Sequence, residues 1–392
     1  MQSELSVQTS CRACRVSFQC RELLPVDRGF RRRGRRQRRP GRRQLIRKVI
    51  GISGVEVQVL TMNPGRHFSL RACFGLGNGS GGGPVIYNEQ DILDNLGDAE
   101  VISSINIGGI WTSVLYRVEL QDTSRVVVVK KLQNERGSTV DASLNDRCQS
   151  EVNLLESIGH DNIISLAGCI PGDDSILLVY DHKENGSLNQ WLHPDPPQLA
   201  AQGVLGWPTR RAIAIGAAQG LCCLHHGRNH PIVHHNINST NILLDTGLKP
   251  KITGFDLARI NLAGPDQPVP IWELTAANMV GYTAPEYLTV GATAKVDVYS
   301  FGVVLLGLVT GRVAYEPIED GHLAAWAGTH CNRLMENTGD FSGVVDMAIP
   351  HRARYLKEMA AMFKLGVDCT VREPQERPSM HEVLYRLRNR GR

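Results

Sequence analysis

The pattern of apolar and polar positions changes character along the chain. Two alternating or apolar runs, Val114–Leu120 and Arg125–Leu132, are separated by the turn-like residues Gln-Asp-Thr-Ser. Runs of this length and composition are typical of β-strands, so the pair is predicted to form a hairpin. The other elements expected in this part of the chain are strands at Ile163–Ala167 and Ser175–Tyr180 and a helix at Ser150–Ile158.

After Gly186 the apolar residues recur three or four positions apart, which indicates helices. A small strand-rich part followed by a larger helical part is an α+β, two-lobed plan. We expect an N-lobe at about 101–181 and a C-lobe at about 186–391. The expected C-lobe helices are Leu188–Leu192, Pro208–His226, Lys295–Thr310, Leu356–Val367 and Ser379–Leu387.

The first 84 residues have a different composition. Arg28–Lys48 contains eleven Arg, one Lys and no acidic residue, so the net charge of +4 arises entirely from this segment. Like charges repel and bury no apolar surface, and a Gly-rich stretch follows at 75–83. We therefore predict a basic, disordered segment at 1–84 and one folded domain at 85–392.

Composition also bears on location. The ten Cys are scattered, which suits a reducing compartment better than a disulfide framework. There is no run of 18 or more apolar residues and no secretory signal pattern. We expect a cytoplasmic protein, and residues 28–48 are suited to peripheral attachment at the anionic plasma membrane.

Two motifs carry candidate chemistry. The first, His234–Asn241, reads HHNINSTN, and the second, Gly254–Asp256, reads GFD. They stand where a protein kinase has H-R-D-x-x-x-x-N and D-F-G. The chain thus resembles a protein kinase in which Asn236 replaces the catalytic Asp, and in which Gly and Asp are exchanged around Phe255.

Seven further matches to that family occur in the family's order, over residues 85–392. The residues of these motifs are similar to those of plant leucine-rich-repeat receptor-like kinases, and the HAESA-like group is the nearest group within that family. The resemblance implies a two-lobed protein-kinase fold. The matches are Val127–Leu132, Glu151, His160–Ile163, Leu178–Leu188, Ala284–Glu286, Asp297–Gly302 and Arg377–Met380.

The resemblance also assigns a nucleotide site. Lys130 would hold the α- and β-phosphates of ATP, and Glu151 would hold Lys130. Gly108 is the first Gly of the phosphate loop, whereas Ile110 and Ser113 stand at its next two Gly positions. Residues without a Cβ allow close approach to phosphates, so we expect a weakened loop. The other nucleotide-binding positions implied are Val128, which is bulkier than the usual Ala, and Tyr180, Asp181 and Leu243.

Substitutions gather at the expected reacting centre. Asn236 cannot accept a proton, and Asn238 replaces a Lys of the family's serine/threonine members. Gly254 replaces the main Mg²⁺ ligand, so Mg²⁺ is not expected to find its usual donors. Asn241 is either a metal ligand or a structural amide. Asp256 is either a displaced metal ligand or, as we expect, a solvated loop acid.

The elements that brace the family's fold are retained. Glu286 and Arg377 would form a buried ion pair in the C-lobe. His234 and Phe255 would stack with Leu155 in a hydrophobic column, and Asp297 would anchor its base.

These features favour a catalytically impaired pseudokinase that acts as a binding module in phosphorylation signalling. Its expected partners are other signalling proteins, among them active receptor-like kinases, and its ATP binding is expected to be weak. One alternative is a weakly active, ATP-dependent Ser/Thr protein kinase. A second is a protein that binds nucleic acid or anionic lipid through its Arg-rich segment, although nucleic acid is not the partner that we expect.

Two patterns of cysteine and histidine are candidate metal sites. Cys11 and Cys14 form a C-x-x-C pair with Cys20 nearby, but no fourth ligand stands at a suitable spacing. The pairs 225–226 and 234–235, both His-His, are expected to be capping or core residues and not metal ligands.

Overall fold

The computed structural model describes residues 48–52, 55–59, 87–107, 111–121, 124–134, 139–195, 203–264, 267–268, 279–287, 289, 291–316, 321–336 and 341–389. The chain divides into two compact units, Met1–Arg66 and His67–Arg392. In the first, strand β1 (Lys48–Ile52) pairs antiparallel with β2 (Val55–Val59). Apart from this pair, the segment 1–84 lies outside the described residues.

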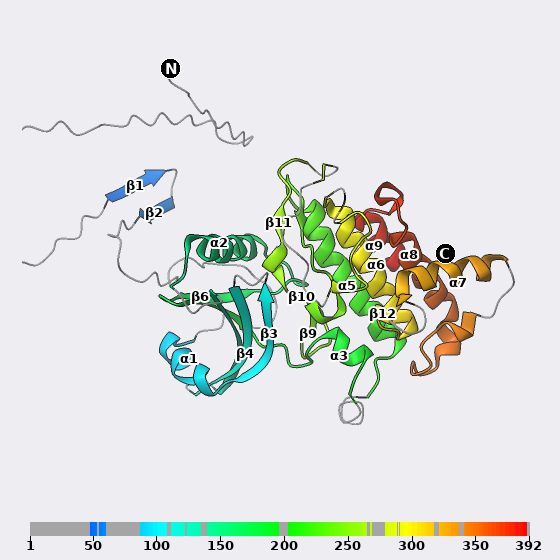
Figure 1. Cartoon of the computed structure of the whole chain (residues 1–392), viewed down its shortest axis with the longest axis horizontal. Helices are drawn as coiled ribbons and strands as arrows, with labels where there is room; N and C mark the ends of the chain where they lie inside the picture. The colour runs from blue at the N-terminus through cyan, green and yellow to red at the C-terminus, as the bar shows by residue number, and fades with distance from the viewer. Residues whose placement is uncertain are drawn as a thin grey trace, which may run out of the picture. The chain divides into compact units, whose positions relative to one another are not determined.

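A five-stranded antiparallel sheet forms the N-lobe of the second unit (Figure 1), and its strand order is β3-β4-β5-β7-β6. The predicted hairpin is confirmed as β4 and β5, and β3 was not predicted. The strand predicted at 163–167 begins later, at Leu166, and is β6. Ile163 instead makes an isolated bridge with Ile252. The bounds are β3 Glu100–Ile107, β4 Trp111–Leu120, β5 Arg125–Asn134, β6 Leu166–Pro171 and β7 Ser175–Asp181.

Two helices pack on this sheet. Helix α1 (Glu89–Asn95), followed by η1 (Leu96–Asp98), was not predicted and contacts β4. Helix α2 (Ala142–Ser157) begins well before its predicted start, where the Asp141 side chain accepts a hydrogen bond from the Leu144 amide (2.8 Å). Its buried residues include Leu144, Cys148, Val152 and Leu155, which recur at helical spacing.

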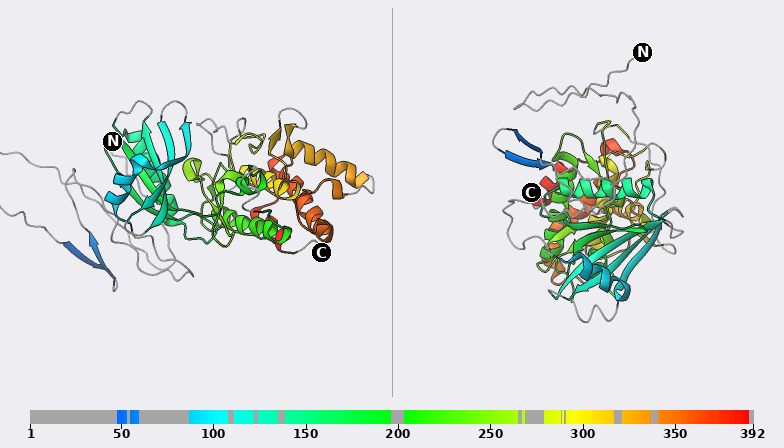
Figure 2. Two further views of the ribbon diagram at one scale, coloured as in Figure 1. Left: turned by 90° about the horizontal axis from the view of Figure 1, so that it is seen from below. Right: turned by 90° about the vertical axis from the view of Figure 1, so that its left-hand side faces the viewer.

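Helices make up most of the C-lobe (Figure 2). The five predicted helices are confirmed with ends shifted by up to two residues, and α7 was missed. Helix α6 is buried along almost its whole length and packs closely on α8, where a Cβ on Gly302 would lie 2.6 Å from Cβ of Cys369. The bounds are α3 Leu188–Leu192, α5 Trp207–His226, α6 Ala294–Thr310, α7 Leu323–Glu336, α8 Leu356–Cys369 and α9 Met380–Arg388.

Short strand pairs fix the loops between the lobes. β8 pairs with β11, and β9 pairs with β10. The segment 234–241 therefore connects β8 to β9, and the segment 253–258 connects β10 to β11, so both loops have paired strands at each end. The remaining pair is β12 with β13. The bounds are β8 Ile232–Val233, β9 Ile242–Leu244, β10 Pro250–Ile252, β11 Arg259–Ile260, β12 Tyr315–Glu316, β13 Gly321–His322, η2 Ser239–Asn241, η3 Phe255–Leu257, η5 Phe341–Gly343, η6 Arg352–Tyr355 and η7 Pro374–Glu376.

The predicted α+β, two-lobed plan is therefore confirmed. Its largest apolar core runs from α2 and the inner face of the sheet through α5, α6 and α8. A smaller core lies between α1 and the outer face of the sheet.

Candidate nucleotide site and catalytic loop

Lys130 occupies a buried position on β5, opposite Leu115 of β4 and Leu178 of β7. Residues at every second position of a strand share a face, so Lys130 points toward α2 together with Val128 and Leu132. The structure brings Lys130 and Glu151 of α2 together. The Lys130 Nζ atom lies 3.1 Å from Glu151 Oε1 and 2.8 Å from Glu151 Oε2.

Two more side chains complete this group, which we call the Lys130 cluster: Lys130, Glu151, Tyr180 and Asp256. The Tyr180 hydroxyl donates to Glu151 Oε1 (2.8 Å), so this side chain points into the lobe and contacts α2. Asp256 Oδ1 forms an ion pair with Lys130 Nζ. The expectation that Asp256 is a solvated loop acid is therefore wrong, because η3 turns its carboxylate back toward β5.

Opposite charges hold the Lys130 cluster together. Burial alone would lower the pKa of Lys130, but the carboxylates of Asp256 and Glu151 outweigh it and raise that pKa. Burial would raise the pKa of Asp256, yet the ammonium of Lys130 lowers it. Burial, with the nearby Glu151, keeps the pKa of Tyr180 well above its usual value. The contacts with Asp256 and Glu151 therefore stabilise the ammonium form of Lys130.

The catalytic-loop segment is held mainly through its backbone. Asp297 of α6 accepts hydrogen bonds from the amides of His234 (2.7 Å) and His235 (2.9 Å). The same carboxylate contacts His225 Nε2 at 2.9 Å. The predicted anchoring role of Asp297 is thus present in the geometry, whereas His225, at the end of α5, was not identified as its partner.

His234 lies between this anchor and Phe255. The two rings meet edge to face, with centroids 4.7 Å apart, and Leu155 belongs to the same buried core. The Nε2 atom of His234 contacts the Thr253 carbonyl at 3.1 Å, and the Nδ1 atom of His234 accepts a hydrogen bond from the Asn236 amide at 3.2 Å. Both ring nitrogens are used by the neutral form, and burial lowers the pKa of His234 to about 4.

The three Asn side chains of the loop bond to one another and to the backbone. Asn238 Nδ2 donates to Asn236 Oδ1 (2.9 Å), and Asn238 Oδ1 accepts from the amides of Thr240 and Asn241. Asn241 Nδ2 donates to the Asn236 carbonyl (2.9 Å). Asn241 thus makes the bond expected of a structural amide, and this bond uses Nδ2 and not the Oδ1 atom that would bind a metal ion.

Gly254 stands where the family has its main Mg²⁺ ligand. Its backbone is left-handed, with φ at +82°, and a Cβ there would lie 2.6 Å from Nδ2 of Asn241. Mg²⁺ requires several oxygen ligands in octahedral geometry. Gly254 supplies no side chain and Asp256 is paired with Lys130, so the side chains in this place do not fit a Mg²⁺ ion.

The other implied nucleotide positions are dispersed around the cluster. Val128 and Leu243 are half-buried on β5 and β9. Asp181, at the end of β7, forms longer ion pairs with Arg125 (3.7 Å) and Lys183 (3.9 Å). The other positions implied for the phosphate loop, Gly108 and Ile110, lie outside the described residues, and Ser113 is buried within β4.

The predicted brace of the C-lobe is present. Arg377 Nη1 lies 2.6 Å from Glu286 Oε1, and Nη2 lies 2.8 Å from Glu286 Oε2. The remaining three N–H groups of Arg377 donate to the carbonyls of Val371, Lys295 and Arg372. Every donor of this fully buried guanidinium is therefore satisfied.

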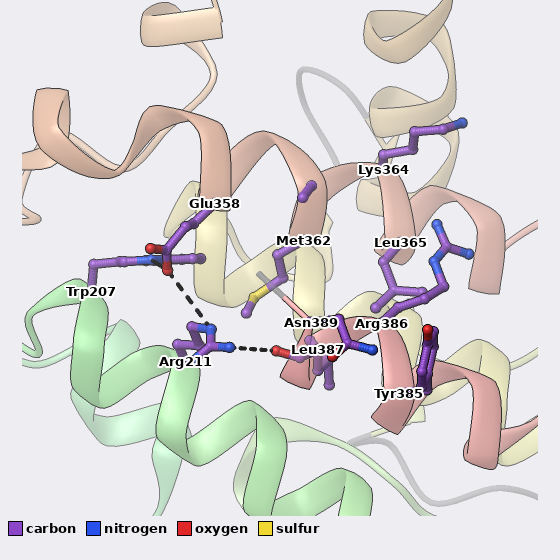
Figure 3. Close-up of a pocket in the computed structure, with 11 residues that line it drawn as sticks. Trp207, Arg211, Glu358, Met362, Lys364, Leu365, Tyr385, Arg386, Leu387 and Asn389 are labelled. Carbon is purple, nitrogen blue, oxygen red and sulfur yellow. Dashed lines mark hydrogen bonds and ion pairs between the residues drawn. The ribbon is translucent and has the colours of Figure 1, made fainter. Parts of the chain in front are cut away.

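A cavity of about 390 Å³ lies away from all of these residues, between α5, α8 and α9 (Figure 3). Trp207 and Arg211 both contact Glu358 at its edge. Arg211 also donates to the Leu387 carbonyl (2.7 Å), so the polar groups drawn together there join the three helices.

Residues 103–386 match the protein kinase domain. This match covers most of the chain and spans both lobes. The chain belongs to the protein kinase family. Among the described residues of this kinase domain, no helix is long and apolar enough to cross a membrane.

The similar proteins are plant receptor-like kinases. The chain is 36% identical over 312 residues to the Arabidopsis thaliana receptor protein-tyrosine kinase CEPR1, covering 77% of this chain and 30% of that protein. It is 35% identical over 304 residues to the leucine-rich repeat receptor protein kinase MSP1 of Oryza sativa subsp. japonica, covering 76% and 22%. The chain thus spans less than a third of the length of these relatives and corresponds to a receptor-like protein kinase domain.

Proposed function

We propose that this kinase domain is a pseudokinase, a catalytically impaired module that binds other proteins in phosphorylation signalling. The observation that carries the proposal is the state of Lys130. An ammonium has three N–H donors, and those of Lys130 face Glu151 Oε1, Glu151 Oε2 and Asp256 Oδ1. Phosphate oxygens would have to compete with a carboxylate for this side chain.

The catalytic loop supports the same proposal. Phosphoryl transfer needs a group that accepts the substrate hydroxyl proton, and protein kinases in general use ATP with Mg²⁺. The amide of Asn236 has no basic atom, and loss of a general base costs about 10²–10⁴ in rate. With no fitting Mg²⁺ donors at Gly254, two requirements of the reaction are unmet in the same place.

ATP binding is therefore proposed to be weak and independent of metal. The alternative is a weakly active Ser/Thr protein kinase in which Asp256 or Asn241 binds a metal ion. In that alternative a metal ion would compete with Lys130 for the carboxylate of Asp256, or it would bind Oδ1 of Asn241, whose Nδ2 donates to the Asn236 carbonyl.

The proposal also covers subgroup, partners and location. We propose membership of the HAESA-like group, with active receptor-like kinases as partners. Among the relatives, one is named a receptor-like protein kinase and another a leucine-rich repeat receptor-like serine/threonine-protein kinase. The proposed location is the cytoplasm, with residues 28–48 attaching to anionic membranes. Vesicle binding that weakens with added salt, and is lost without residues 1–48, would support this attachment.

Two measurements on the full chain test the pseudokinase proposal. The first is a thermal-shift titration with ATP, with and without Mg²⁺ or Mn²⁺. The second is transfer of labelled phosphate from ATP to a generic substrate, with an active receptor-like kinase domain as the positive control. We expect no metal-dependent shift and no transfer above background. Turnover near ~1 s⁻¹, the low end for protein kinases, would refute the proposal.

A further inference from the structure

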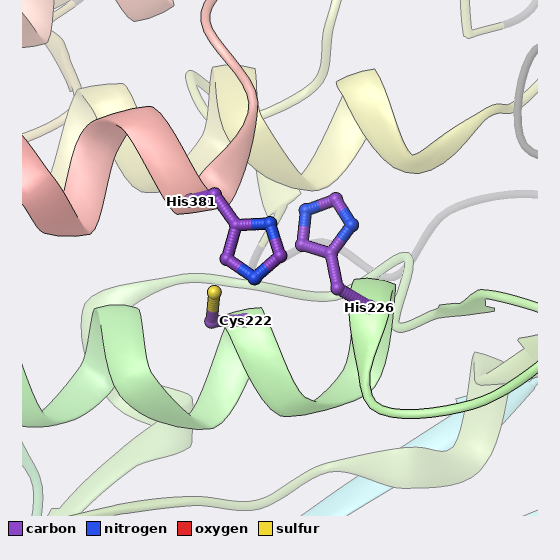
Figure 4. A group of neighbouring side chains, drawn as sticks. All are labelled: Cys222, His226 and His381. Atoms are coloured by element: carbon purple, nitrogen blue, oxygen red, sulfur yellow. The ribbon is translucent and has the colours of Figure 1, made fainter.

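A cysteine and two histidines meet at the junction of α5 and α9 (Figure 4). Cys222 and His226 are four positions apart on α5, so they lie on the same face of that helix, one turn apart. His381 is the second residue of α9. The ligand atoms of these three side chains all lie within 4.8 Å of one another.

The three side chains lie close together, and at least one imidazole must turn before all three can bind the same ion. The rings of His226 and His381 are stacked, with centroids 4.1 Å apart and planes inclined by 14°, so the in-plane lone pairs of their nitrogens run nearly parallel. Cys222 lies below them on α5 and its sulfur points toward the ring of His381 (Figure 4). Cys222 is buried, whereas both imidazoles are exposed. An ion could therefore enter from solvent and reach the thiol.

We propose that Cys222, His226 and His381 form a zinc site that joins α5 to α9. One thiolate and two neutral imidazoles form a donor set that suits Zn²⁺ and is poorly suited to Mg²⁺ or Ca²⁺. A water molecule would take the fourth tetrahedral position, as in zinc sites with three protein ligands. The site lies apart from the Lys130 cluster, on other elements of the fold.

The distances are compatible with this ion. Bonds of about 2.3 Å to sulfur and about 2.0–2.1 Å to nitrogen place tetrahedral ligand atoms roughly 3.4 Å apart. Rotation of the exposed imidazoles about their side-chain torsions would close the remaining gap. Helices α5 and α9 already pack against each other, so the backbone positions are held before an ion binds.

Metal binding at this site would depend on pH. Ligands of Zn²⁺ must be deprotonated, so binding would release the thiol proton of Cys222 to solvent. The affinity for Zn²⁺ would therefore rise with pH.

The test uses the full chain with Cys11, Cys14, Cys20 and Cys73 changed to Ser, so that the N-terminal cysteines cannot contribute. Co²⁺ replaces Zn²⁺ as a spectroscopic probe, because thiolate ligation gives a sulfur-to-cobalt charge-transfer band. We expect one equivalent of Co²⁺ with this band, displaced by Zn²⁺. Zn²⁺ at about 100 times its Kd should also raise the melting temperature by roughly 5 °C.

Single variants decide whether these three residues are the ligands. Cys222→Ser should abolish the charge-transfer band, and His226→Asn and His381→Asn should each weaken Co²⁺ binding by at least tenfold. The matched control is His351→Asn, an exposed His outside the cluster, which should bind Co²⁺ like the parent. Absence of the band in the parent, or unchanged binding in either imidazole variant, would overturn the proposal. Because both imidazoles are exposed, those two variants remain decisive even if Cys222→Ser fails to fold.

Discussion

The carboxylate of Asp256 contacts the ammonium of Lys130, although Asp256 follows Phe255 and the family's aspartate precedes it. The short helix η3 makes this possible, since it turns the chain so that Asp256 faces β5. The exchange of Gly and Asp therefore leaves a carboxylate beside Lys130. Two things differ from the family. The carboxylate is contributed by the residue after Phe255, and the residue before Phe255, Gly254, has no side chain.

Asp256→Asn should increase the affinity for ATP. The change removes one of the two carboxylates that occupy Lys130, so a phosphate oxygen would meet a donor with less competition. A hydrogen bond to a charged group contributes about 1.5–3 kcal/mol, which corresponds to a gain of roughly 10- to 100-fold. Isothermal titration without divalent metal measures it. Asp368→Asn, in the C-lobe, is the control, and equal affinities in both variants would contradict the expectation.

Lys130→Met should destabilise the fold even though no nucleotide is present. Glu151 and Asp256 would both lose the ammonium that pairs with them, at a cost of about 3–5 kcal/mol for a broken buried pair. Urea unfolding monitored by circular dichroism measures the change. Lys131→Met, the adjacent and less buried position on β5, should cost far less. Adding Asp256→Asn to Lys130→Met should recover part of the loss, and strict additivity would argue against coupling.

Restoring the missing carboxylates should not restore full kinase activity. The triple variant Asn236→Asp, Gly254→Asp and Asp256→Gly rebuilds the base and the metal ligand in sequence. Residue 254 would keep a left-handed backbone, where a non-Gly residue costs about 1–2 kcal/mol, and its Cβ would crowd Asn241. Ile110 and Ser113 would also still stand at Gly positions of the phosphate loop.

Phosphate transfer by the triple variant is therefore expected to stay well below ~1 s⁻¹. The labelled-ATP assay measures it, with the parent chain in parallel. Turnover typical of active family members would show that neither position 254 nor the phosphate loop limits the reaction.

Arg377→Ala should be strongly destabilising. The change leaves Glu286 without its cation and three backbone carbonyls without their donor, so about 3–5 kcal/mol is expected. The melting temperature or the soluble yield reports it. Arg386→Ala is the matched control, because the Arg386–Asp368 pair is about a third exposed on both sides and should contribute at most ~1 kcal/mol. Similar losses in both variants would refute the bracing role.

Stability should fall as the pH drops from 6.5 toward 4. The folded-state pKa of His234 is about 4, below the ordinary value near 6.5, so the unfolded chain binds this proton first. Stability therefore increases with pH across this window, and His234 alone should account for about 2 kcal/mol between pH 7.5 and 5. Urea unfolding at the two pH values measures it. His234→Asn should reduce the difference and His351→Asn should not.

The spacing of apolar residues in the sequence was sufficient to predict the helices and strands that bury one continuous face. The hairpin of β4 and β5 and helices such as α3 and α5 follow directly from apolar spacing. Helix α1 was missed because it is short and buries only Ile92, although Asn88 caps it and acidic residues fill its first turn. Those two features were a usable signal for a helix start.

Only those contacts of the site that involve residues of the family motifs could be predicted from the sequence. The meeting of Lys130 with Glu151 and of Glu286 with Arg377 followed from family resemblance. The position of Asp256 did not, because it depends on how η3 turns relative to β5, which no local pattern encodes. Likewise, Cys222 and His226 show helical spacing in the sequence, but His381 lies far along the chain and reaches them only through packing of α9 on α5.

The carboxylate of Asp297 accepts hydrogen bonds from main-chain amides of the catalytic loop. One of these amides belongs to His235, whose backbone has a positive φ of 66°. The backbone of the loop is thus positioned by a residue on α6, and the hydrogen bond that Asn236 Oδ1 accepts from Asn238 could be accepted equally by an aspartate oxygen. A lineage that carries this anchor can exchange Asp for Asn at that position without passing through an unstable ancestor. At this position, loss of the catalytic base would then cost the fold little stability.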